Sequence, residues 1–199
     1  MEYLVTMTTH VPDGTAQQEV DEVRAREAAR SGELVAQRHL LRLWRPPLRP
    51  GEWRTLGLFA ADDAGALEKL LASMPLRVWR TDEVTPLGPH MFDPPAAAAG
   101  SGTEFFVAFA MTVPDGTPDQ AVDDTVAAEG RRVTELAGQG HLSRIWRLPD
   151  GRTLGLYRAA DEAGLAVILR SLPLYPWMKL QVTPLSPHPS DPGGGALVR

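Results

Sequence analysis

Apolar and polar residues alternate over several short segments of the chain and recur every three to four residues over longer ones. Alternation predicts strands that bury one face, and the longer period predicts amphipathic helices. In the first half, the order is strand, helix, strand, strand, helix, strand. The predicted elements span residues 2–7, 16–37, 39–45, 55–59, 61–74 and 84–87.

The second half of the chain repeats this pattern. The segment "HLLRLWR" at His39 returns as "HLSRIWR" at His141, and "RTLGLF" at Arg54 returns as "RTLGLY" at Arg152. The first copy has a longer loop, "PPLRPGEW", in a turn that tolerates insertion. We therefore expect two like domains. The predicted divisions are domains at 1–92 and 104–191, a flexible linker at 93–103 and a loose tail at 192–199.

The βαββαβ order predicts a ferredoxin-like domain, with an antiparallel sheet that carries both helices on one face. The other face of each sheet is apolar and needs a cover, which two linked copies can give each other. The sequence thus predicts an α+β protein with two ferredoxin-like βαββαβ domains packed as a pseudo-dimeric α+β barrel. We expect Trp44 and Trp146 at the interface between the copies.

A carboxylate interrupts the apolar stripe of each long helix. Steps of seven residues pass through Val20, Glu27 and Leu34 in the first copy. The equivalent positions of the second copy are Val122, Glu129 and Leu136. Glutamate is rarely buried without a partner, so each position requires one.

The strand after each long helix offers candidate partners. Alternation places His39, Leu41, Leu43 and Arg45 on one face, and His141 and Arg147 recur at equivalent positions. We expect Arg45 and Arg147 to approach the two glutamates. Such a pair is either a structural salt bridge or a general base in a dry pocket, with its pKa raised by desolvation and lowered by the cation. The histidines are expected at the helix–strand junctions or, alternatively, in the pocket wall.

Composition narrows the range of functions. The chain has a formal net charge of -5 with scattered Lys and Arg, so neither nucleic acid nor an anionic membrane is an expected partner. It contains no cysteine, which excludes disulfides and thiolate ligands and fits the cytoplasm. Its five histidines lack metal-ligand spacing, so no metal site is expected. No apolar run approaches the length of a membrane span.

Three segments of the chain resemble muconolactone Δ-isomerases. They are "EYLVTMTTHVP" from Glu2, "VRAREAARSGELVAQRHLLRLWR" from Val23 and "LRSLPLYPWMKLQVTPLSPHPSD" from Leu169. A chain of that family is about as long as one copy, so the resemblance covers both halves and leaves only the linker and the tail.

The resemblance implies a cofactor-free enzyme of the β-ketoadipate pathway, in aromatic compound catabolism, that assembles from α+β dimers into rings. Such enzymes move one proton from C4 to C2 of an unsaturated lactone and so shift its double bond. By resemblance, Glu27 or Glu129 is the base, and Arg45, Arg147 or Lys179 binds the substrate carboxylate. The remaining candidates for substrate contact are Tyr175, Trp177, His188, His39 and His141. We expect self-association through sheet faces or into a ring.

Each copy departs from the family pattern at a different end. The first keeps "RARE", Arg24 to Glu27, but has "MPLRVWR" after its second helix. The second keeps "SLPLYPWMK" and "HPS" but retains only Glu129 of the helix motif. Two explanations stay open. Either a composite pocket joins the helix of one half to the C-terminal segment of the other, or the substrate has changed and both pockets have drifted.

The predicted function is therefore cofactor-independent isomerisation of a small unsaturated lactone, such as muconolactone, or of a related enolisable carbonyl compound. Two alternatives come from other classes. One is a cofactor-independent monooxygenase or cyclase of the dimeric α+β barrel group, and the other is a non-catalytic small-molecule-binding protein.

Overall fold

The chain forms two compact units in a computed structural model that describes residues 1–193. Unit 1 comprises residues 1–87 and 186–193, and unit 2 comprises residues 88–185. Most of the predicted tail, residues 194–199, lies outside the described residues. No helix among residues 1–193 is long and apolar enough to cross a membrane.

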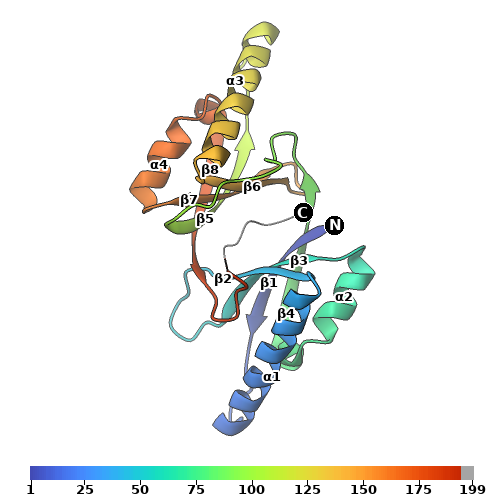
Figure 1. Cartoon of the computed structure of the whole chain (residues 1–199). Coiled ribbons are helices and arrows are strands. Elements are labelled where there is room, and N and C mark those ends of the chain that lie inside the picture. Colours follow the sequence, from blue (N-terminus) through green and yellow to red (C-terminus); the bar gives the residue numbers. More distant parts are fainter. Residues whose placement is uncertain (194–199) are drawn as a thin grey trace. The chain divides into compact units, whose positions relative to one another are not determined.

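Unit 1 has the predicted order of elements (Figure 1). Its elements are β1 (Glu2–Thr9), α1 (Gln17–Ala36), β2 (Leu40–Arg45), β3 (Arg54–Ala60), α2 (Ala64–Ala72), a 3-10 turn η1 (Pro75–Trp79) and β4 (Arg80–Pro89). The antiparallel strand order is β4-β1-β3-β2, which makes β4 and β2 the two outer strands. Side chains from both helices pack with the sheet in one core that includes Val5, Leu34 and Leu67.

Unit 2 repeats this arrangement with its own core. Its elements are β5 (Thr103–Met111), α3 (Asp119–Gly138), β6 (Leu142–Arg147), β7 (Thr153–Ala159), α4 (Glu162–Arg170), a 3-10 turn η2 (Tyr175–Trp177) and β8 (Met178–Pro187). The antiparallel order is β8-β5-β7-β6. The predicted fold class, α+β with two ferredoxin-like βαββαβ domains of the dimeric α+β barrel type, is confirmed.

Local sequence explains where the shorter helices begin. Asp63 accepts a hydrogen bond from the backbone N–H of Ala66 at 2.7 Å and so caps α2, and Asp161 accepts one from Gly164 at 2.7 Å and caps α4. The glycine of the repeated "TLGL" motif is explained by side-chain packing. A Cβ at Gly57 would lie 2.4 Å from the ring of Phe59, so glycine leaves room for the aromatic side chain over the strand.

The predicted alternation of the β2 strand is wrong at its start. A register shift between Leu40 and Arg42 places Leu40, rather than Leu41, in the helix-side core. After this bulge, Leu43 packs in that core, whereas Arg42 stacks over Trp44 with its Cζ 4.8 Å from the ring centroid. A bulge inserts one residue and reverses the parity that simple alternation assumes. The placement of Trp44 between the copies stays a prediction.

Each unit is completed by a segment from the other sequence repeat. The last residues of β8, Ser186 and Pro187, pair with Arg45 and Trp44 of β2 in unit 1. Likewise, Gly88 and Pro89 at the end of β4 pair with Arg147 and Trp146 of β6 in unit 2. The repeats and the compact units are thus divided at different points of the chain.

A buried aspartate anchors each of these segments. In unit 1, Asp191 accepts from Nε of Arg42 at 3.1 Å and from the backbone N–H of Leu43 at 2.8 Å. The side chains of Arg42 and Asp191 are 3% and 4% exposed. Asp93 makes the equivalent contacts with Arg144 and Ile145 in unit 2. We call each pair a latch, named by its aspartate.

Residues 93–103, predicted as a flexible linker, are tied to unit 2 at several points. Besides the Asp93 latch, the N–H of Ala98 donates to the carbonyl of Ala137 at 2.9 Å. The backbone of Gly100 approaches Gly140 so closely that a Cβ would lie 2.1 Å from its carbonyl oxygen. Small residues in this segment therefore permit close backbone contact.

Candidate active site

A cavity of about 380 Å³ lies within unit 1. Side chains from β1, α1, the η1 turn and the C-terminal segment 188–190 contribute to its wall. Its polar and charged lining residues are Thr9, Asp21, Arg24, Glu27, Ser31, Arg45, Thr55, Arg80, His188 and Ser190. The cavity therefore joins the first repeat to the end of the second, which is the composite arrangement that the sequence left open.

Glu27 reaches the cavity from α1 and is held by two donors. Its Oε2 accepts from the backbone N–H of Leu76 at 2.8 Å, and its Oε1 accepts from Nη1 of Arg80 at 3.0 Å. Leu76 follows Pro75 in the first turn of η1, where backbone N–H groups have no partner within the helix. The side chain of Glu27 is 13% exposed, so the carboxylate is mostly but not fully desolvated.

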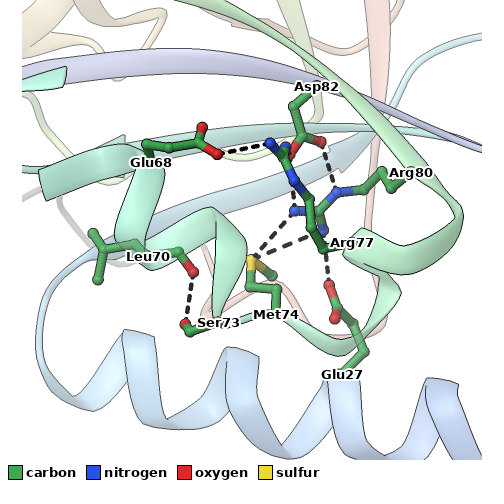
Figure 2. A network of polar contacts seen from close by, with 8 residues as sticks. All are labelled: Glu27, Glu68, Leu70, Ser73, Met74, Arg77, Arg80 and Asp82. Atoms are coloured by element: carbon green, nitrogen blue, oxygen red, sulfur yellow. Dashed lines mark hydrogen bonds and ion pairs between the residues drawn. The ribbon is translucent and has the colours of Figure 1, made fainter. Parts of the chain in front are cut away.

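Arg80 is shared between Glu27 and a second carboxylate (Figure 2). Its Nε lies 2.6 Å from Oδ1 of Asp82, and both side chains are 2% exposed. Arg77 also pairs with Asp82 and, at 2.8 Å, with Glu68. Asp82 therefore offsets part of the positive charge that Arg80 places beside Glu27.

Burial raises the pKa of Glu27 above its ordinary value of 4.5. The hydrogen bond from Leu76 and the charge of Arg80 lower the pKa, and the charge of Asp82 raises it, but the desolvation effect is the largest. The carboxylate is therefore a stronger base than an exposed glutamate.

The predicted pairing of Glu27 with Arg45 is wrong. Glu27 lies over η1 and the start of β4, and Arg45 lies on β2 at the opposite edge of the sheet, with β1 and β3 between. The predicted pairing of Glu129 with Arg147 fails in the same way, because Glu129 accepts from the backbone of Leu174 at 2.9 Å. Alternation correctly places Leu43 on the helix side of the sheet but does not give the order of the strands.

Two arginines with exposed side chains lie along the cavity wall. Arg24 stacks on Trp53, with its Cζ 5.5 Å from the ring centroid, and Arg45 ends β2. Within residues 1–193, neither guanidinium has a hydrogen-bonded carboxylate partner. The backbone of Trp53 is held against the end of β1, since the Trp53 carbonyl accepts a hydrogen bond from the N–H of Thr9 at 2.9 Å. The guanidiniums of Arg24 and Arg45 are therefore available to bind the carboxylate of a ligand.

His188 contributes a neutral imidazole to the cavity. Its Nδ1 accepts from the backbone N–H of Ser190 at 3.1 Å, so the ring proton is assigned to Nε2. Burial lowers the pKa of His188, the nearby charges of Arg45 and Arg24 lower it further, and Asp191 acts in the opposite direction. A neutral ring with an Nε2–H can donate a hydrogen bond to an oxygen of a ligand.

The equivalent region of unit 2 is packed with apolar side chains. Phe92, Met178 and Leu180 pack against the unit 2 core, at the positions that Ser190, Arg80 and Asp82 occupy in the first unit. A Cβ at Gly130 would lie 3.0 Å from the Phe92 ring, so this ring covers α3 beside Glu129. Burial raises the pKa of Glu129, but within residues 1–193 no arginine pairs with its carboxylate.

The structure brings together three of the predicted site residues: Glu27, Arg45 and His188. His39 and His141 lie at helix–strand junctions, where Nδ1 donates to the carbonyls of Ala60 at 3.0 Å and Arg158 at 3.1 Å. The remaining candidates belong to unit 2 and do not line this cavity. They are Glu129, Arg147, Tyr175, Trp177 and Lys179.

Sequence reasoning missed Arg24, Trp53, Arg80 and Asp82 as cavity and network residues. A signal was present in the comparison of the two copies. Arg80 and Asp82 correspond to Met178 and Leu180 of the second copy, so the charged pair occurs in the first copy alone. A charged pair that occurs in only one of two repeats indicates a site used by that repeat.

Comparison with known proteins covers both repeats. A family model described as muconolactone delta-isomerase matches residues 1–93 and again residues 103–191. Muconolactone Delta-isomerase 1 of Acinetobacter lwoffii is 34% identical over 88 residues, which are 44% of this chain and 92% of the relative. The muconolactone Delta-isomerase of Cupriavidus pinatubonensis is 29% identical over 88 residues, 44% of this chain and 96% of the relative. Each relative thus corresponds to one repeat.

Among solved structures, a heme-binding protein from Thermus thermophilus has a TM-score of 0.58 with 12% sequence identity. The match covers 96% of this chain and 93% of that chain. At this identity, the similarity shows the fold alone. It spans both units, whereas the isomerase relatives span one repeat each.

Proposed function

The chain belongs to the muconolactone Δ-isomerase family and is an isomerase, and from this premise we propose that its unit 1 cavity shifts a double bond in a small unsaturated lactone that carries a carboxylate. The observation that carries the proposal is Glu27, a carboxylate of raised pKa in a cavity that also contains Arg24 and Arg45, whose guanidiniums have no carboxylate partner within residues 1–193. A volume of about 380 Å³ is at the lower end of small-molecule sites.

Glu27 is proposed as the base that moves the proton. It takes the proton from C4 of the lactone, and the electron pair of that C–H bond forms the C3–C4 double bond. The electrons of the former C2–C3 double bond form a C1–C2 double bond, and the carbonyl electrons move to the carbonyl oxygen, which carries the negative charge of the dienolate. Glu27 then returns the same proton to C2, so the reaction neither consumes nor releases a proton.

The dienolate oxygen needs a donor, because its charge develops in the cavity away from bulk water. His188 is suited to this role, since its neutral ring carries a proton on Nε2 and lines the cavity. Arg24 and Arg45 are suited to the substrate carboxylate, which a guanidinium binds through two parallel hydrogen bonds. In this arrangement the substrate is held by its carboxylate while its ring faces Glu27.

Muconolactone is the compound with which to test the proposed function. Proton NMR of the compound with the purified chain should show the vinyl signals of the substrate replaced by those of the enol-lactone product. In heavy water, any exchange of the transferred proton on Glu27 will appear as deuterium at C2. Failure to convert muconolactone or any carboxylated unsaturated lactone would contradict the proposal.

The isomerase family favours this reaction over the monooxygenase, cyclase and binding-protein alternatives. Its members' names also fit a place in aromatic compound catabolism. A cytoplasmic location, a cofactor-free reaction and self-association into a ring stay predictions. The oligomeric state can be measured by light scattering.

The pH dependence of activity gives a prediction about Arg80. Because only ionised Glu27 accepts a proton, kcat/KM should fall as the pH drops through its raised pKa, at a pH above 4.5. The double variant Arg80→Met/Asp82→Leu copies the apolar pair of unit 2. It removes Arg80, which lowers the pKa of Glu27, together with Asp82, which raises that pKa by less. We expect the acid limb of its profile to move to higher pH.

The measurement is kcat/KM against pH for both proteins, with thermal unfolding as a check on folding. The double variant Met178→Leu/Leu180→Met is the matched control, because it alters the equivalent positions of unit 2 while keeping them apolar. An acid limb at the same pH in wild type and Arg80→Met/Asp82→Leu would show that Glu27 is not the titrating base.

A further inference from the structure

A second hollow of about 250 Å³ adjoins the cavity in unit 1. Its lining residues are Arg24, Arg45, Leu48, Glu52, Trp53 and Arg54. Arg24, Arg45 and Trp53 also line the main cavity, so the two spaces share a wall. We call the second hollow the outer groove.

The outer groove is built by the loop that only the first repeat has. Residues 46–53, "PPLRPGEW", take the place of the shorter "LPDG" in the second repeat, where Gly151 stands at the position of Trp53. The loop closes on itself, because the N–H of Glu52 donates to the carbonyl of Arg49 at 3.0 Å and Oε2 of Glu52 accepts from the N–H of Arg49 at 3.1 Å. Its three prolines further restrict its backbone.

The charge of the outer groove favours an anion. Three guanidiniums, those of Arg24, Arg45 and Arg54, face a single carboxylate, Glu52. Arg54 and Glu52 are 3.9 Å apart with side chains 39% and 34% exposed, so their pairing is weak and Arg54 can turn to a ligand. Trp53 and Leu48 supply an apolar wall between these charges.

The two ends of this cationic region lie on adjacent strands. Arg45 ends β2 and Arg54 begins β3, and the two strands pair in antiparallel register from Leu40 to Trp44. Both side chains line the outer groove, so one ligand in this space can reach each of them. A monocarboxylate held by Arg24 and Arg45 would leave Arg54 with only its weak pairing to Glu52.

We propose that the outer groove is a subsite for a second acidic group, so that this enzyme acts on a lactone with two anionic groups on a short spacer. The reacting ring lies beside Glu27, one carboxylate lies between Arg24 and Arg45, and the spacer follows Trp53 to a second anion at Arg54. The identity of the reacting ring rests on the proposed function, whereas the second anion rests on the groove.

Inert ligands test the subsite without turnover. Benzene-1,4-dicarboxylate and benzoate share one aromatic ring and differ by one carboxylate, and isothermal titration calorimetry gives the Kd of each. We expect the dicarboxylate to bind wild type about tenfold more tightly. In Arg54→Ala this preference should fall to near equality, and replacement of residues 46–53 by Leu-Pro-Asp-Gly should have the same effect.

The matched control is Arg152→Ala, which removes the arginine at the equivalent strand position of unit 2, where it pairs with Asp150 at 2.8 Å. Its preference for the dicarboxylate should equal that of wild type. Equal binding of both ligands to wild type, or a preference that survives in Arg54→Ala, would overturn the subsite. A preference that depends on Arg54, together with no lactone isomerisation, would instead reject the proposed function alone.

Discussion

Replacing Glu27 by glutamine is expected to lower kcat about a thousandfold while the protein stays folded. A general base in a positioned site contributes on the order of 10²–10⁴-fold. Glutamine keeps the shape of the side chain and an oxygen that accepts from the N–H of Leu76, and Arg80 keeps its pair with Asp82. The loss should therefore come from the missing proton acceptor.

Glu129→Gln is the matched control for this variant. Glu129 sits at the equivalent helix position and accepts from the equivalent backbone group, Leu174 N–H, but Phe92 and other apolar side chains pack the region around it. We expect its kcat to equal that of wild type. Steady-state kinetics and circular dichroism of both variants test the assignment, and full activity in Glu27→Gln would exclude a carboxylate base in unit 1.

Removing the Asp191 latch is expected to have the second largest effect. Asp191→Ala removes the buried carboxylate that pairs with Arg42 and that accepts a hydrogen bond from the N–H of Leu43. Loss of one partner of a buried ion pair typically costs about 3–5 kcal/mol of unfolding free energy. Because Asp191 follows the segment that carries His188 and Ser190 into the cavity, kcat/KM should also fall in the protein that remains folded.

Asp93→Ala separates these two effects. It removes the same contacts from Arg144 and Ile145 in unit 2, where no candidate for the reaction depends on them. Chemical denaturation should show a similar loss of stability in both variants, but only Asp191→Ala should lose activity per folded molecule. Asp191→Asn, which retains an acceptor for Leu43, extends the test if the alanine variant does not fold. Equal activity of the folded Asp191 and Asp93 variants would contradict a positioning role for the latch.

The sequence predicted the fold well because its signals are local. Each βαββαβ half is encoded by short-range periodicity, and the repeated "HLLRLWR" and "TLGL" segments marked equivalent strands in both halves. Glu27 was identifiable for the same reason, since a carboxylate within an apolar stripe is visible from helical period alone.

The contacts of the site were less predictable because they depend on strand order and on a bulge. The partner of Glu27 is Arg80 on one outer strand rather than Arg45 on the other, which no periodicity distinguishes. The bulge after Leu40 changed which β2 residues face the core. Asp93 is the first residue of the predicted linker and Asp191 is the last residue before the predicted tail, and a buried ion pair leaves no periodic signal in such segments.

The two repeats have diverged unequally around a common scaffold. Unit 1 combines Arg24 and Glu27 from α1 with His188 and Ser190 from the far end of the chain. At the equivalent positions, unit 2 has Val126, Glu129, His90 and Phe92, and it keeps the glutamate within an apolar environment. This pattern supports one working site in each chain, with the second repeat supplying its C-terminal segment.

The number of ligand sites in a chain tests this central claim most directly. Isothermal titration calorimetry of wild type with an unreactive saturated analogue of the lactone acid should give one site for each chain. Arg24→Ala/Arg45→Ala should abolish that binding, because both arginines belong to the unit 1 cavity. Two equivalent sites in each wild-type chain, or binding that persists in this double variant, would contradict the account.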